Sequence, residues 1–210
     1  MKITKVVLQL LLALCLLAVQ AFAALPADKT SYTPKEVTFM SGIRMLFAQN
    51  LNWERIYFYE RLANAPDADK TKQRLLTCQD DISNALREYY GEDIANQLDA
   101  LLKQHVQSLD DFANIVRSGA GDKTPIVSAL YDNADAVTSL LGMQNMFVNK
   151  DALSAALKKY DDMLAAEINL QYPNIGSVDT NAFDTTFSQA MSLADIISIG
   201  TLKQFSSKFW

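Results

Sequence analysis

Histidine is nearly absent from this chain of 210 residues, which contains only His105. Histidine-rich zinc sites and the paired Glu-x-x-His helices of di-iron bundles need several imidazoles, so the sequence excludes both. Position 102, three residues earlier, is a leucine and not a carboxylate. A lone histidine on a mostly apolar helix face is more often a hydrogen-bonded core residue than a ligand or a proton carrier.

Cysteine is scarce as well, with Cys15 near the N-terminus and Cys78 in the body of the chain. Two cysteines exclude a fold that depends on a disulfide framework. Leu14 precedes Cys15 where a lipoprotein-type signal would have a small residue, which disfavours a lipid anchor there. For Cys78 we expect a buried, inert thiol on a helix, and pairing between chains is the alternative.

Basic residues are too few and too scattered for a nucleic-acid partner. Lys and Arg number 19 against 24 Asp and Glu, so the formal charge is −5, and without Lys2 and Lys5 it becomes −7. Phosphate neutralisation and attachment to anionic lipid both need clustered positive charge. The only glycine-rich stretch, Gly119-Ala120-Gly121, lacks the Gly-Lys-Ser/Thr ending of a phosphate loop, which argues strongly against a kinase or ATPase.

One long apolar run is present, from Val6 to Val19, with Gln9 as its only interruption. Two lysines precede it, and Ala21-Phe22-Ala23 follows as a small-x-small cleavage site. The run is short for a membrane span, so the pattern predicts an export signal and not an anchor. We therefore expect a signal peptide over 1–23, a single helical domain over 24–210 without an integral membrane segment, and a periplasmic or secreted protein.

Apolar residues recur at three- and four-residue steps from Pro34 onward, and glycine and proline are confined to a few breaks. This spacing predicts six helices and no strand, and we expect Asp67, Thr124 and Asp151 to cap the second, fourth and fifth. Four long and two shorter helices joined by short loops fit an all-α, antiparallel helical bundle. The expected ranges are 34–63, 68–90, 92–117, 124–141, 151–170 and 181–205.

Two of the expected helices share a spacing. Leu98, Leu102 and His105 in the third have the same four-then-three steps as Leu153, Leu157 and Tyr160 in the fifth. That spacing would place an imidazole and a phenol at equivalent positions on two helix faces. The residues before them do not match, and such spacing is common in amphipathic helices.

Acidic side chains beside apolar helix positions allow two interpretations. If they converge on Arg55, Arg74 or Arg87, they form ion pairs that fix helix register, which is the more common case. The alternative is a carboxylate-lined pocket for a cation or a polar ligand. The residues concerned are Glu54, Asp80, Asp81, Asp135, Glu167 and Asp195.

Short motifs over most of the mature chain resemble an uncharacterised family of exported bacterial helical-bundle proteins. They are Trp53-Glu54-Arg55, Arg74-Leu75-Leu76, Asp81-Ile82-x-Asn84, Tyr90-Gly91, Leu101-Leu102-x-x-His105, Asn133-Ala134-Asp135, Ala194-Asp195, Gly200 and Gln204-Phe205. The resemblance implies a small bundle without an established activity. Some members are labelled acetylglutamate kinase, which their sequences do not support.

The resemblance also implies a polar cluster in the bundle centre. Family members tend to have histidines at what correspond to Asn50, His105, Tyr160 and, less clearly, Gln189, whereas this chain keeps only His105. If those histidines hold a metal, the three substitutions put that role in doubt here. A hydrogen-bonded polar cluster at the same place would survive them.

We therefore interpret the chain as a ligand- or partner-binding module that uses no cofactor. The expected ligand-binding residues are Asn50, Trp53, Arg55, His105, Tyr160 and Gln189. One alternative is a metal-dependent or hydrolytic enzyme on the same cluster, with Glu54, Glu167 or Asp195 as acid or base. Another is a structural protein whose polar interior only sets helix register.

Overall fold

The computed structural model describes residues 31–172 and 179–210, so the predicted signal peptide lies outside the described residues. The chain divides into two units, Met1–Thr33 and Pro34–Trp210. The second unit contains six α-helices and a short 3-10 helix and, within the described residues, no strand. They are α2 (Pro34–Leu62), α3 (Ala68–Tyr90), α4 (Glu92–Ser118), α5 (Thr124–Gln144), α6 (Lys150–Gln171), α7 (Thr180–Gln204) and η1 (Ser206–Phe209).

The observed helices confirm the all-α bundle, and their ends lie within three residues of the predicted ones. The two shortest, α5 and α6, have 21 and 22 residues, and the other four have 23 to 29. None of the described helices is both long enough and apolar enough to cross a bilayer.

Helix caps differ from the predictions. The Asp67 side chain makes no capping bond and instead accepts a hydrogen bond from Lys70 at 2.7 Å. Helix α5 begins at Thr124 itself, and its first N–H donates to Asp122. Asn149, not Asp151, caps α6 by accepting from a backbone N–H. Short polar side chains at neighbouring positions compete for the same N–H groups, and the backbone conformation before the helix selects one.

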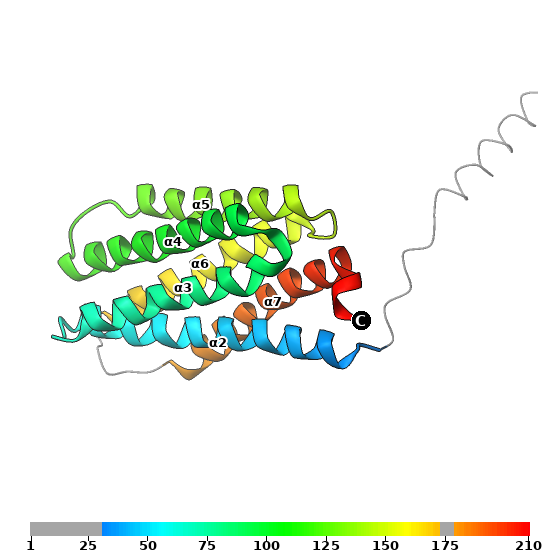
Figure 1. The fold of residues 1–210 in the computed structure, drawn as a ribbon. Coiled ribbons are helices and arrows are strands. Elements are labelled where there is room, and N and C mark those ends of the chain that lie inside the picture. Colours follow the sequence, from blue (N-terminus) through cyan, green and yellow to red (C-terminus); the bar gives the residue numbers. More distant parts are fainter. Residues whose placement is uncertain (1–30, 173–178) are drawn as a thin grey trace, which may run out of the picture. The chain divides into compact units, whose positions relative to one another are not determined.

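The helices follow one another around the bundle (Figure 1). Each packs against the next in the chain, and α7 returns to pack against α2. Helices α2, α4 and α6 also contact one another across the middle. Side chains that point inward from these three helices therefore meet at the bundle centre.

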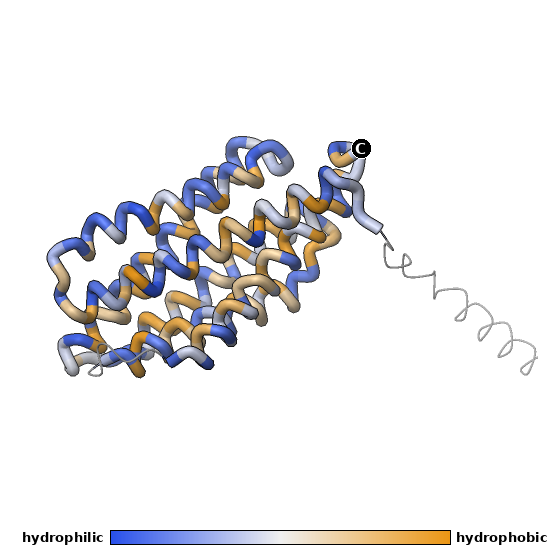
Figure 2. Tube along the Cα trace, turned by 90° about the horizontal axis from the view of Figure 1, so that it is seen from below, coloured by the Kyte–Doolittle hydropathy of each residue, from blue (hydrophilic) through white to orange (hydrophobic). Residues whose placement is uncertain are grey.

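The core consists of aliphatic and aromatic side chains from all six helices. Hydrophobic and hydrophilic stretches alternate along the tube, as is typical of amphipathic helices (Figure 2). Full burial of a leucine or isoleucine contributes about 1.5–3 kcal/mol, so this core accounts for much of the folding free energy. Its fully buried members include Leu51, Leu75, Val106, Leu109, Leu153 and Leu193.

Two helical glycines offer a matched test of this packing. A Cβ at Gly200 on α7 would lie 2.8 Å from Val148 Cγ2, whereas a Cβ at Gly42 on α2 would meet nothing within 4 Å. We expect Gly200→Ala to lower the free energy of unfolding by about 1–3 kcal/mol, because an overpacked core must shift. Gly42→Ala should raise it by about 0.5–1 kcal/mol through helix propensity. Urea denaturation measures both, and equal effects from the two variants would contradict the close approach of α7 to the α5–α6 connection.

Candidate functional site

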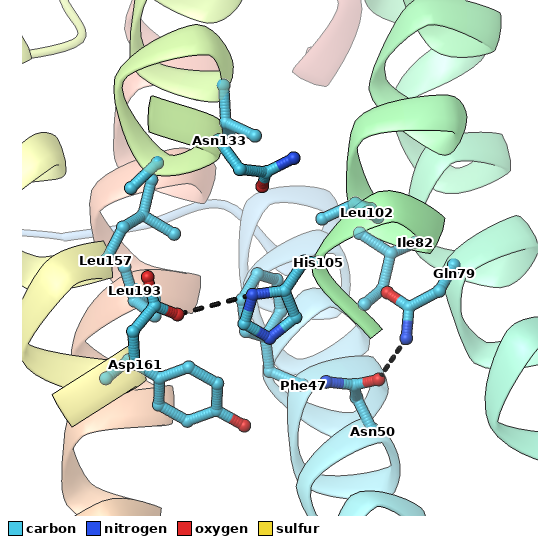
Figure 3. A pocket seen from close by; sticks show the side chains of 13 residues that line it. Phe47, Asn50, Gln79, Ile82, Leu102, His105, Asn133, Leu157, Asp161 and Leu193 are labelled. Atoms are coloured by element: carbon cyan, nitrogen blue, oxygen red, sulfur yellow. Dashed lines mark hydrogen bonds and ion pairs between the residues drawn. The ribbon is translucent and has the colours of Figure 1, made fainter. Parts of the chain in front are cut away.

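A cavity of about 50 Å³ lies in the bundle, next to His105. Figure 3 shows His105 with polar side chains from α2, α3, α5 and α6 around it. The polar lining residues are Asn50, Gln79, His105, Asn133, Tyr160 and Asp161, and the apolar ones are Phe47, Ile82, Leu102, Ala134, Val137, Leu157 and Leu193. A water needs about 10–15 Å³ on this measure, so the space suits a few waters or a ligand of a few heavy atoms.

His105 lies between two buried carboxylates. Its Nδ1 is 3.3 Å from Asp161 Oδ1, and its Nε2 is 3.6 Å from Glu54 Oε1, which is longer than a hydrogen bond. Burial alone would lower the pKa of His105, but the negative charges of Asp161 and Glu54 outweigh it and the pKa is raised. The two carboxylates therefore favour the protonated form of the imidazole.

Tyr160 completes the cluster from α6. Its hydroxyl donates to Glu54 Oε2 at 2.5 Å, and its ring lies 6.4 Å from the His105 ring, nearly parallel to it. Burial and the neighbouring Glu54 carboxylate raise the tyrosine pKa well above its ordinary value, so the phenol stays protonated. Glu54 has no solvent-exposed surface, which makes this hydrogen bond the main compensation for its desolvation.

Asp161 retains its proton more strongly than an exposed aspartate. Burial raises its pKa to about 7, with the nearby Glu54 charge adding to the effect and His105 opposing it. Within the described part of the chain, its second oxygen, Oδ2, has no hydrogen-bond donor. Near neutral pH, Asp161 can therefore gain or lose a proton according to what occupies the cavity.

Three of the six predicted ligand-binding residues line this cavity. Asn50 accepts a hydrogen bond from Gln79 Nε2 at 2.6 Å, and His105 and Tyr160 belong to the acid cluster. The shared spacing predicted equivalent positions on two helix faces, and the rings of His105 on α4 and Tyr160 on α6 lie 6.4 Å apart beside the cavity. Whether these residues bind a ligand stays a prediction.

The other three predicted residues lie elsewhere. Gln189 is buried and donates to the backbone oxygen of Ala156 at 2.8 Å. Arg55 pairs with Glu167 at 3.1 Å, and its guanidinium lies over the Phe183 ring. The Trp53 ring is covered by the Arg74 guanidinium, 5.3 Å from its centre. None of the three lines the cavity.

Sequence reasoning missed Gln79 and Asp161 as site residues and noted Asn133 only as part of a motif. A signal exists for Gln79, which lies four residues after Leu75 and three before Ile82 and so shares their buried face. Asn133 likewise lies three residues after Leu130 and four before Val137. The same pattern marks Asp161, which lies four residues after Leu157 and three before Leu164, whereas Asp162 lies four residues after Lys158.

A second buried acid forms a contrasting, fully paired cluster. Asp110 accepts hydrogen bonds from Tyr57 at 2.6 Å, Arg61 at 2.9 Å and Lys72 at 2.8 Å. Burial would raise its pKa, but these donors and the positive charges lower it. Because both oxygens are used, this cluster fixes α2, α3 and α4 together and offers nothing to a ligand.

The predicted pairing of acids with arginines occurs only in part. Arg55 pairs with Glu167, whereas Asp195 makes two hydrogen bonds of 2.6 Å to Arg44 on the surface. Glu54, Glu167 and Asp195 do not share one site. Within the described ranges, no three His, Cys, Asp or Glu side chains are arranged to hold a metal ion. The two carboxylates beside His105 face different nitrogens of its ring, so they do not converge on one point.

Comparisons with models of protein families, with curated proteins and with solved structures found no match.

Proposed function

We propose that this chain is an exported helical bundle that binds a small polar ligand in the central cavity beside His105. The observation that carries the proposal is the cavity itself, which combines about 50 Å³ of space with polar groups from five helices. If the polar interior served only to set helix register, close packing would be expected to fill that space with side chains. Buried polar groups without partners cost free energy, and a ligand that pairs with them recovers it.

Export rests on the N-terminal pattern of Lys2, Lys5 and the apolar run to Val19. Membership of the family of exported bacterial bundles rests on the short motifs and stays a prediction. A precursor found uncut in the cytoplasm would contradict export while leaving the binding proposal open.

A catalytic role is less well supported by the same geometry. A histidine that acts as general base needs one nitrogen free to reach its substrate. Both nitrogens of His105 instead face carboxylates, and the Tyr160 hydroxyl occupies the far side of Glu54. This arrangement suits a fixed, paired imidazole better than a proton shuttle.

The test is a thermal-shift screen of polar compounds with two to six heavy atoms against the purified full chain. At 100 times its dissociation constant, a ligand adds about 2.7 kcal/mol to the free energy of unfolding. Ala134→Val, which adds two methyl groups to the cavity wall, should abolish any such stabilisation. The matched control is Ala100→Val on the exposed face of α4, which should leave it unchanged. The proposal would be overturned if no compound stabilised the protein, or if Ala134→Val left the stabilisation by every hit unchanged.

A further inference from the structure

Acceptor oxygens outnumber free donors in the wall of the cavity. Asn133 uses its Nδ2 group on Leu101 O at 2.9 Å and Gln104 Oε1 at 3.4 Å. Gln79 uses its Nε2 group on Asn50 Oδ1. Within the described residues, neither amide oxygen accepts a hydrogen bond, and Asp161 Oδ2 accepts none either.

These three side chains are almost wholly buried, and they line the cavity. Gln79 is 1% exposed, Asn133 5% and Asp161 3%. Figure 3 shows them extending from α3, α5 and α6 toward the space beside His105. Three acceptor oxygens without a protein donor at one cavity favour a ligand that brings several donors.

The charges around the cavity favour a positive ligand. Glu54 and Asp161 carry two negative charges when ionised, and His105 supplies one positive charge at most, when it is protonated. The second anionic charge is therefore not neutralised by any basic group in the cavity wall. Cations are attracted to such a site, and the attraction is strong because the site is buried.

We infer that the ligand is a small organic cation with several N–H donors, of the amidinium or alkylammonium class. This inference rests on the proposed binding function and names the chemistry of its ligand. The cation donates to the Asn133, Gln79 and Asp161 oxygens and neutralises the excess negative charge. The volume of the cavity limits it to about two to four heavy atoms.

Binding of a cation is coupled to the ionisation of Asp161. The titratable groups that face Asp161 are His105 from α4, Glu54 from α2, and Tyr160 and Asp162 from α6. With the pKa of Asp161 at about 7, the carboxylate is mostly protonated at pH 6 and mostly ionised at pH 8. The apparent affinity for a cation should therefore rise about tenfold over that interval, in proportion to the ionised fraction.

Three probes of nearly equal size and shape separate charge from fit: acetamidinium, acetamide and acetate. Calorimetric titration of the purified full chain at pH 8 should give acetamidinium an affinity at least tenfold above acetamide, with acetate weakest. Sodium chloride at the same ionic strength is the control for a metal cation. Equal binding of acetamide, tighter binding of acetate or an equal effect of sodium would each overturn the cation inference. If none of the three probes binds, the cation inference also fails. The proposed binding function is tested separately, by the thermal-shift screen of polar compounds.

Two variants change the charge of the cavity in opposite directions. Asp161→Asn should remove the preference for acetamidinium and its dependence on pH. Gln79→Glu should strengthen acetamidinium binding and weaken acetate binding, because the Asn50 amide can turn to donate to the new carboxylate. Circular dichroism checks that both variants are folded. If Asp161→Asn does not fold, Gln79→Glu alone decides, and unchanged probe affinities in that variant contradict the inference.

Discussion

Glu54→Ala should lower the free energy of unfolding by about 3–5 kcal/mol. Glu54 is fully buried, and its removal leaves the Tyr160 hydroxyl without an acceptor and the His105 cation with one acid instead of two. Removing one partner of a buried ionic cluster costs more than the cluster contributes as a whole, because the remaining groups stay desolvated. Urea denaturation followed by far-ultraviolet circular dichroism measures the loss.

Three variants control this experiment. Glu88→Ala on the exposed face of α3 should change stability by less than about 0.5 kcal/mol. Glu54→Gln should lose less than Glu54→Ala, because the amide oxygen still accepts from Tyr160. The double variant Glu54→Ala/Tyr160→Phe should lose less than the sum of its two single variants, since the orphaned hydroxyl is absent. A loss below about 1 kcal/mol for Glu54→Ala would show that the cluster does not hold α2 and α6 together.

The stability of the unliganded protein should fall by at least about 2 kcal/mol as pH rises from 5 to 7. The pKa of Asp161 is raised to about 7 in the folded chain, above that of an exposed aspartate, so the folded state holds a proton in this interval that the unfolded chain has released. Unfolding then releases a proton and becomes easier as pH rises. The raised pKa of His105 acts in the same direction. The stability that the protonated imidazole contributes is complete below about pH 6.5, the ordinary pKa of histidine, and is lost as pH rises through the pKa in the folded chain.

Urea denaturation at pH 5, 6, 7 and 8 measures this slope. Asp161→Asn should flatten it, whereas Asp184→Asn, on the exposed side of α7, should preserve it. The lowered pKa of Asp110 has the opposite effect, but only at more acidic pH, where that carboxylate gains its proton. A stability that stays constant or rises between pH 5 and 7 would contradict a protonated Asp161 in the folded chain.

The positions of the helices could be predicted closely because their signals are local. Pro66, Gly91 and the Gly119 region interrupt the apolar spacing, and the observed helices end within a few residues of them. Gly91 and Gly119 both adopt a positive φ, which glycine tolerates without strain. Cap residues were less predictable, since Asn149 and Asp151 are equally suitable by composition and only the backbone distinguishes them.

The candidate site was predicted only in part. His105, Tyr160 and Asn50 lie on the inner faces of their helices, and the apolar spacing around them indicates that. Gln189 lies on an inner face too, but a backbone oxygen of α6 satisfies its amide group. Asp161 was missed although Leu157 and Leu164 place it on the buried face of its helix, because an aspartate is usually exposed.

The amino-acid sequence by itself determined six helices, their lengths and the face that each one buries, because hydrogen bonding within a helix and apolar periodicity involve residues only a few positions apart. The tertiary structure alone decided that Glu54, His105 and Asp161 share one site. These residues are more than 50 positions apart along the chain and meet only because α2, α4 and α6 contact one another across the centre. Helix periodicity fixes which face is buried, whereas the partner of each buried polar group depends on how the helices pack.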